Sequence, residues 1–75
     1  MITVKVIWQS SGKPAEGRKV SLGFNALFSG GVTNSEYTDS NGEAHFNAEN
    51  GDGQVFVDGS TKHKGYLSGR IVVYI

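Results

Sequence analysis

Hydrophobic and polar residues alternate with a period of two along most of the chain, and this pattern predicts strands rather than helices. The first segment, Ile2 to Gln9, places every second residue, Trp8 included, on one face. The same alternation predicts strands at residues 2–9, 19–24, 32–38, 43–46, 54–58 and 70–75. Residues 60–68 are polar and irregular, with a short seventh strand possible at Tyr66 and Leu67.

Turn-forming residues separate these segments. Pro14, between Gly12 and Gly17, predicts a turn after the first strand, because proline fixes φ and glycine accepts positive φ. Asp39-Ser40-Asn41-Gly42 predicts a tight hairpin turn, and Asn50-Gly51-Asp52-Gly53 predicts another. Several short strands separated in this way are typical of a β-sandwich or a small barrel.

The composition agrees with an all-β fold. Val, Ile, Phe, Tyr and Trp together number 20, against 8 for Ala, Leu and Met, and the 11 glycines leave no room for a long helix. A chain of 75 residues makes one domain, residues 1–75. We therefore predict a small immunoglobulin-like or prealbumin-like antiparallel β-sandwich of six or seven strands, with the rings of Trp8, Phe24 and Phe46 in its core.

Charge and cysteine content exclude several classes of function. Seven basic residues balance seven acidic ones, so no net field attracts nucleic acid or an anionic membrane. Without cysteine the chain has no disulfide, thiol nucleophile or thiolate metal site. It begins with no leader-like segment and has no apolar run of bilayer length, so we expect no membrane insertion. A full-length product is expected in the cytoplasm, and an excised module in the periplasm or outside the cell.

Three segments carry turn and strand motifs in a fixed order. The first is Gly12-Lys13-Pro14-Ala15-Glu16-Gly17, followed by the alternating residues Val20-Ser21-Leu22. The second is Thr38-Asp39-Ser40-Asn41-Gly42, followed by Ala44-His45-Phe46. The third is Gly53 before Val55 and Val57, with Gly65-Tyr66 further along.

These motifs resemble those of the carboxypeptidase regulatory-like domains, which have a transthyretin-like (prealbumin-like) sandwich. The family has a Gly-x-Pro-x-x-Gly turn, a Thr-Asp-x-x-Gly hairpin and a Gly-x-Tyr strand, and Val55 stands here in place of that tyrosine. The resemblance implies an accessory module, such as a domain beside an enzyme, a receptor plug or a surface repeat. No catalytic residue belongs to the motif, so the resemblance implies none here.

Candidate catalytic and metal-binding residues are few. The segment from Asp39 to Glu43 has oxygen ligands but too few carboxylates for a calcium loop, so we interpret it as a hairpin turn. His45 should point away from the core, and His63 lies between two lysines that repel a cation. Ser40, His45 and Asp39 lack the strained nucleophile turn of a hydrolase. We therefore expect no enzyme activity, no catalytic residue, no metal and no cofactor.

Apolar residues on the outward side of the strands are the better candidates for a contact surface. If their strands are neighbours, four of them form an apolar stripe: Ile7, Phe56, Val72 and Tyr74. Alternatively, the loop at 25–31 or the stretch at 60–68 folds across them. The loop tip at Leu27 and Phe28 either plugs an open end of the sandwich or presents Phe28 to a partner.

The sequence thus favours a non-catalytic structural or protein-interaction module, with self-association through open strand edges as one option. A carbohydrate-binding module is the alternative, and it requires an exposed ring among Trp8, Tyr37, Tyr66 and Tyr74. Binding of single-stranded nucleic acid by a small barrel is disfavoured. Lys62-His63-Lys64 is the only local basic patch, and it falls short of a basic stripe.

Overall fold

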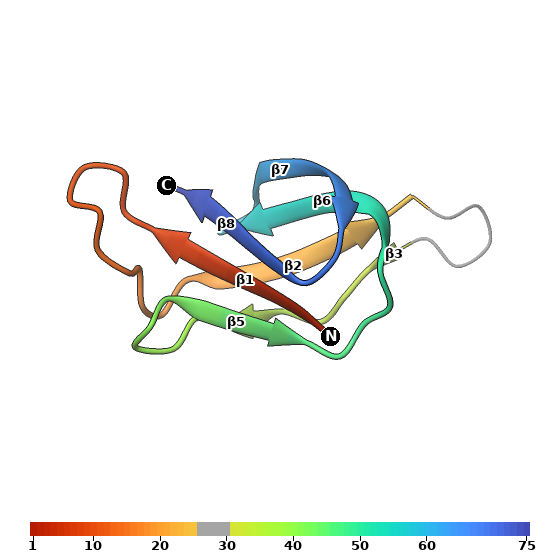
Figure 1. Ribbon diagram of the computed structural model, residues 1–75, viewed down its shortest axis with the longest axis horizontal. Helices are drawn as coiled ribbons and strands as arrows, with labels where there is room; N and C mark the ends of the chain where they lie inside the picture. The colour runs from red at the N-terminus through yellow and green to blue at the C-terminus, as the bar shows by residue number, and fades with distance from the viewer. Residues whose placement is uncertain (26–30) are drawn as a thin grey trace.

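The computed structural model describes residues 1–25 and 31–75, and this part of the chain contains strands and no helix (Figure 1). The strands in it are β1 (Ile2–Ile7), β2 (Lys19–Phe24), β3 (Gly31–Val32), β4 (Glu36–Tyr37), β5 (Glu43–Phe46), β6 (Gly51–Val57), β7 (Ser60–Leu67) and β8 (Arg70–Tyr74). The predicted all-β class is confirmed, although these strands number eight rather than six or seven. In the same residues no helix is long and apolar enough to cross a membrane.

The strands form two sheets. In the three-stranded sheet β1 lies between β5 and β8, and the five-stranded sheet has the order β3-β2-β6-β7, with β4 also paired to β2. β1 pairs with β5 in the antiparallel direction but with β8 in the parallel direction. The prediction of a wholly antiparallel arrangement is therefore wrong. Alternation repeats every two residues in either direction, so it cannot distinguish a parallel neighbour from an antiparallel one.

Both sheets contribute to one hydrophobic core, which contains most of the inward residues that the alternation predicts, together with Ala15 from the connection between β1 and β2 and Leu67 from β7. Its buried members are Ile2, Val4, Val6, Ala15, Val20, Leu22, Ala44, Phe46, Val55, Val57, Leu67, Ile71 and Val73. Thr38 is buried as well, and its polar group is satisfied. Its hydroxyl donates to the carbonyl of Ala15 at 2.6 Å and accepts the N–H of Arg18 at 2.8 Å. Thr38 thus ties the connection between β1 and β2 to the segment that precedes β5.

The three aromatic rings predicted for the core differ in burial. Phe46 is buried and Phe24 packs partly buried against the core. Trp8 is 38% exposed, so its predicted place in the core is wrong. β1 ends at Ile7, and the Trp8 ring instead lies 5.6 Å from the guanidinium carbon of Arg18 in a cation–π contact. Trp8 therefore lies beyond the strand in which alternation would have turned it inward.

The hairpin of β6 and β7 differs most from the prediction. The predicted turn at residues 50–53 falls almost wholly within β6, and the stretch predicted as irregular forms β7. The actual turn is Asp58-Gly59, with φ of 51° and 86°, as a two-residue turn between antiparallel strands requires. A Cβ at Gly53 would lie 1.9 Å from the carbonyl oxygen of Gly23, so Gly53 permits a close backbone approach within the sheet.

The predicted strand at residues 32–38 is interrupted. Residues 33–35 separate β3 from β4, and both short strands pair with β2. The Thr33 N–H donates to the Leu22 carbonyl at 2.8 Å, whereas the Leu22 N–H donates to the Thr33 hydroxyl at 3.0 Å, so a side chain supplies one of the two hydrogen bonds there. Local side-chain bonding of this kind competes with regular pairing.

Candidate functional site

The outer face of the three-stranded sheet brings together most of the outward residues considered above. The strand register places side chains in three rows across this face: His45, Thr3 and Arg70; Glu43, Lys5 and Val72; Ile7 and Tyr74. One end of the face is therefore polar and the other is apolar. We call Ile7, Val72 and Tyr74 the apolar patch.

The apolar patch is accessible. Val72 is 43% exposed and Tyr74 is 57% exposed, while Ile7 beside Tyr74 is half-buried. Residues 60–68 do not fold across it, because most of them form β7 in the other sheet. The patch lies on and beside β8, which forms one edge of its sheet.

Phe56 does not belong to this patch, so the predicted stripe of four residues is wrong. It lies on β6 in the five-stranded sheet, where its ring packs over the backbone of Gly23. A Cβ at Gly23 would lie 2.8 Å from a ring carbon of Phe56. Alternation identifies the outward residues of each strand but does not show which strands share a sheet. The other two predicted contact residues, Leu27 and Phe28, lie outside the described residues.

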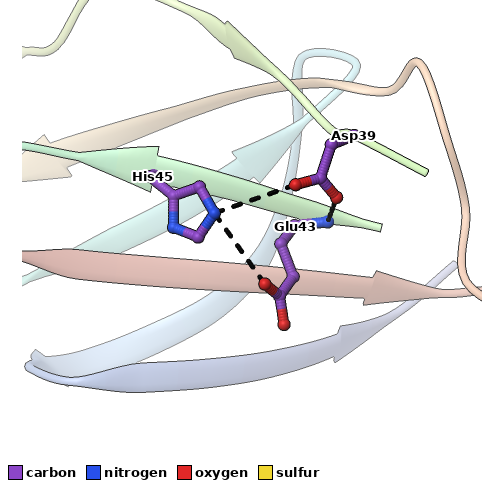
Figure 2. A group of neighbouring side chains, drawn as sticks. All are labelled: Asp39, Glu43 and His45. Carbon is purple, nitrogen blue, oxygen red and sulfur yellow. Dashed lines mark hydrogen bonds and ion pairs between the residues drawn. The ribbon is translucent and has the colours of Figure 1, made fainter. Parts of the chain in front are cut away.

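Asp39, Glu43 and His45 form a cluster at the polar end of the same face (Figure 2). His45 Nε2 lies 3.8 Å from Asp39 Oδ2 and 3.8 Å from Glu43 Oε1. We call these three residues the Asp-Glu-His cluster. Glu43 and His45 share the outward face of β5, and the tight turn at residues 39–42 places Asp39 beside them.

Contacts outside the Asp-Glu-His cluster hold each of its side chains. Asp39 Oδ1 accepts the N–H groups of Asn41 and Glu43 at 2.9 and 3.0 Å, and these bonds, that from Glu43 foremost, lower the pKa of Asp39. Glu43 Oε2 pairs with Arg70 Nη2 at 3.2 Å. His45 Nδ1 forms a 2.9 Å hydrogen bond with Thr3 Oγ1.

A hydrolytic arrangement of Ser40, His45 and Asp39 finds no support in this geometry. Among the described residues, the only hydroxyl hydrogen-bonded to His45 is that of Thr3. Thr3 and His45 lie on a sheet face that is open to water, whereas acyl transfer requires a water-excluded site with aligned donors. The hydrogen bond between them orients the imidazole ring.

The aromatic rings considered for carbohydrate stacking are all at least partly exposed. Tyr37 on β4 and Tyr66 on β7 are 65% and 61% exposed, and Trp8 and Tyr74 are less so. Tyr37 and Tyr66 belong to the five-stranded sheet, whereas Tyr74 lies on the three-stranded one. The rings are therefore distributed over both sheets.

The sequence analysis considered Asp39 with Glu43 as a calcium loop and Asp39 with His45 as part of a hydrolytic arrangement, but it did not bring all three together or use Thr3 or Arg70. A usable signal was the spacing Asp-x3-Glu-x-His, since Glu43 and His45 share a strand face and Asp39 precedes the turn. The parts played by Thr3 and Arg70 depend on strand pairing between distant segments, which no local pattern shows.

The chain matches no protein-family model, and searches of curated proteins and of solved structures give no significant match.

Proposed function

We propose that this chain is a non-catalytic protein-interaction module that binds through the apolar patch and the open edge of β8. The observation that carries the proposal is the exposure of Val72 and Tyr74 on an edge strand whose other residues are buried in the core or charged. Apolar side chains next to unpaired backbone groups are what an added strand from a partner requires.

The proposed fold family is the prealbumin-like sandwich of the carboxypeptidase regulatory-like domains. Its support is the position of the motifs. Gly12–Gly17 lies in the connection between β1 and β2, and Thr38–Gly42 precedes and forms the turn before β5. The two sheets around a common core agree with a sandwich.

Among residues 1–25 and 31–75, no strand pairs with the side of β8 that faces away from β1. The carbonyl of Gly69 accepts the N–H of Thr3, and the N–H of Ile75 donates to Ile7, so alternate residues of this segment bond to β1. In a strand, the residues between them direct N–H and C=O to the opposite side. Arg70, Val72 and Tyr74 therefore present their backbone groups at the edge.

A second copy of the chain is the partner that this edge fits best. In an antiparallel pair of β8 strands centred on Val72, each Arg70 faces the Tyr74 of the other copy and Val72 faces Val72. Every outward N–H and C=O then meets an outward partner, and the Arg70 guanidinium can stack on the Tyr74 ring. The two apolar patches become neighbours on one continuous face.

Size-exclusion chromatography with light scattering, run over a range of protein concentrations, tests this self-pairing. The measured molar mass should rise toward that of a dimer. Val72→Pro should abolish the rise, because it removes an N–H at the open edge without breaking a bond to β1. Val72→Lys should also abolish the rise in mass, because it replaces an apolar side chain of the apolar patch with a charged one. Val32→Lys is the matched control, since Val32 is an exposed valine on the other sheet.

A wild-type mass that stays monomeric at all concentrations would contradict self-pairing. So would a dimer that Val72→Pro leaves intact while circular dichroism shows a native fold. Dimerisation lost in Val32→Lys as well would mean that the contact lies elsewhere.

Carbohydrate binding is the second candidate, and the exposure of Tyr37 and Tyr66 favours it. A ring platform gains stacking energy from sugar faces only where the rings are accessible. Screening against immobilised glycans, with Tyr37→Ala and Tyr66→Ala as variants, tests it. A binding signal that survives both substitutions would argue against this pair of rings.

A further inference from the structure

In the part of the chain that the structure describes, each side chain of the Asp-Glu-His cluster uses one polar atom for a contact outside the cluster and directs the other toward the cluster itself. Asp39 Oδ1 is held by two backbone N–H groups, Glu43 Oε2 by Arg70, and His45 Nδ1 by Thr3. The remaining atoms, Oδ2, Oε1 and Nε2, face one another (Figure 2). Outer contacts that fix ligand orientation in this way are characteristic of metal sites.

The separations between these three atoms suit a shared cation better than direct pairing. All three ligand atoms lie within 4.8 Å of one another, and the two 3.8 Å separations from His45 Nε2 are too long for hydrogen bonds. Ligands around tetrahedral zinc lie about 3.4 Å apart, given bond lengths of roughly 2.1 Å. Binding of one zinc ion by all three atoms therefore requires side-chain rotations that shorten these separations.

The donor set selects the kind of cation. Calcium takes six to eight oxygens and magnesium keeps most of its waters, so one imidazole and two carboxylates suit neither well. Imidazole nitrogen with carboxylate oxygen suits zinc and its first-row neighbours. For Nε2 to offer its lone pair to a cation, the neutral ring must carry its proton on Nδ1 and donate it to Thr3 Oγ1.

We propose that Asp39 Oδ2, Glu43 Oε1 and His45 Nε2 form a surface site for a divalent transition-metal cation, with zinc as its representative. Water completes the coordination, because the site lies on an open sheet face. Arg70 neutralises part of the Glu43 charge and lowers the attraction for the cation, so the site binds more weakly than a closed structural zinc site. None of its three ligand residues belongs to the apolar patch.

Calorimetric titration of the full chain with zinc chloride tests the proposal, and one bound ion per chain is expected. His45→Ala and Glu43→Gln should each weaken binding by at least about 10-fold. His63→Ala is the matched control, because His63 is the only other histidine and lies on β7 outside the cluster. The zinc affinity of His63→Ala should equal that of the wild type.

A second readout identifies the ligand atoms. In proton–nitrogen correlation spectra, zinc should shift the Nε2 resonance of His45 and leave both nitrogens of His63 unchanged. Thr3→Val should keep the same ligands while weakening binding by about 10-fold, because it removes the contact that orients the ring. Circular dichroism of each variant shows that its fold is retained.

Three results would overturn the proposal. The first is a wild-type titration without binding, and the second is equal binding by the wild type and His45→Ala. The third is a loss in His63→Ala as large as in His45→Ala, which would place the cation elsewhere. If the His45 imidazole only forms ion pairs with Asp39 and Glu43, the wild-type titration will show no binding.

Discussion

At the scale of single residues, the Asp39 carboxylate uses one oxygen to stabilise the tight turn and places the other beside His45 on the surface. Its Oδ1 accepts two backbone N–H groups within the tight turn at residues 39–42, and the Gly42 N–H donates to its carbonyl. The sequence could predict this turn from Asp39 and the Asn-Gly pair, because those residues act through their own neighbours. It could not predict that the other carboxylate oxygen meets His45.

The lowered pKa of Asp39 gives a prediction about acid stability. The backbone hydrogen bonds from Glu43 and Asn41 favour the carboxylate in the folded state. Its contribution to stability is therefore present above the pKa of the unfolded chain and disappears as the pH falls through the lower folded value. Asp39→Ala should reduce the urea midpoint at pH 7, and the difference from the wild type should shrink at low pH.

Asp52→Ala is the control for this comparison. Asp52 is exposed on β6, and its carboxylate has no hydrogen bond or ion pair among the described residues. Removing it changes the net charge as Asp39→Ala does, without removing the turn contacts. If both variants show the same pH dependence, net charge rather than the turn hydrogen bonds explains it.

At the scale of elements, alternation was sufficient to predict the strands that supply the core, and it was insufficient to predict β7, the polar strand at the edge of its sheet. β7 carries Lys62 and Lys64 and has polar residues on both faces, so it has no period of two to detect. Such composition protects an edge strand from pairing with other chains. The pair Asp58-Gly59 was the available signal, because Asp-Gly between two segments of strand length favours a hairpin.

Gly53 provides a test of the pairing between β2 and β6. Gly53→Ala should destabilise the fold by about 1–3 kcal/mol or more, because its Cβ would collide with the Gly23 carbonyl, which is backbone and cannot rotate away. Gly31→Ala is the matched control, since a Cβ there meets no atom of residues 1–25 and 31–75 within 4 Å. Equilibrium unfolding in urea measures both. Equal stability of the two variants would show that β2 and β6 do not approach so closely.

At the scale of the whole molecule, the two candidate surfaces share the outer face of one sheet because β1 joins β5 to β8. The Asp-Glu-His cluster comes from the β5 side, whereas Val72 and Tyr74 of the apolar patch come from β8. Their common face depends on pairing between residues 2–7 and both distant strands. Local patterns predicted that Val72, Tyr74 and His45 face outward, but they cannot predict the sheet order or the parallel direction of β8.

Amide hydrogen exchange can show whether β8 is the edge that pairs in the whole molecule. Within one chain, the N–H groups of Ile71 and Val73 point toward β1, while those of Arg70, Val72 and Tyr74 point outward. Self-pairing should therefore slow exchange at Arg70, Val72 and Tyr74 as concentration rises and leave Ile71 and Val73 unchanged. Association through side chains alone would protect no alternate set of amides. Pairing through β7 would instead slow exchange among residues 60–67, so the pattern of protection identifies the edge.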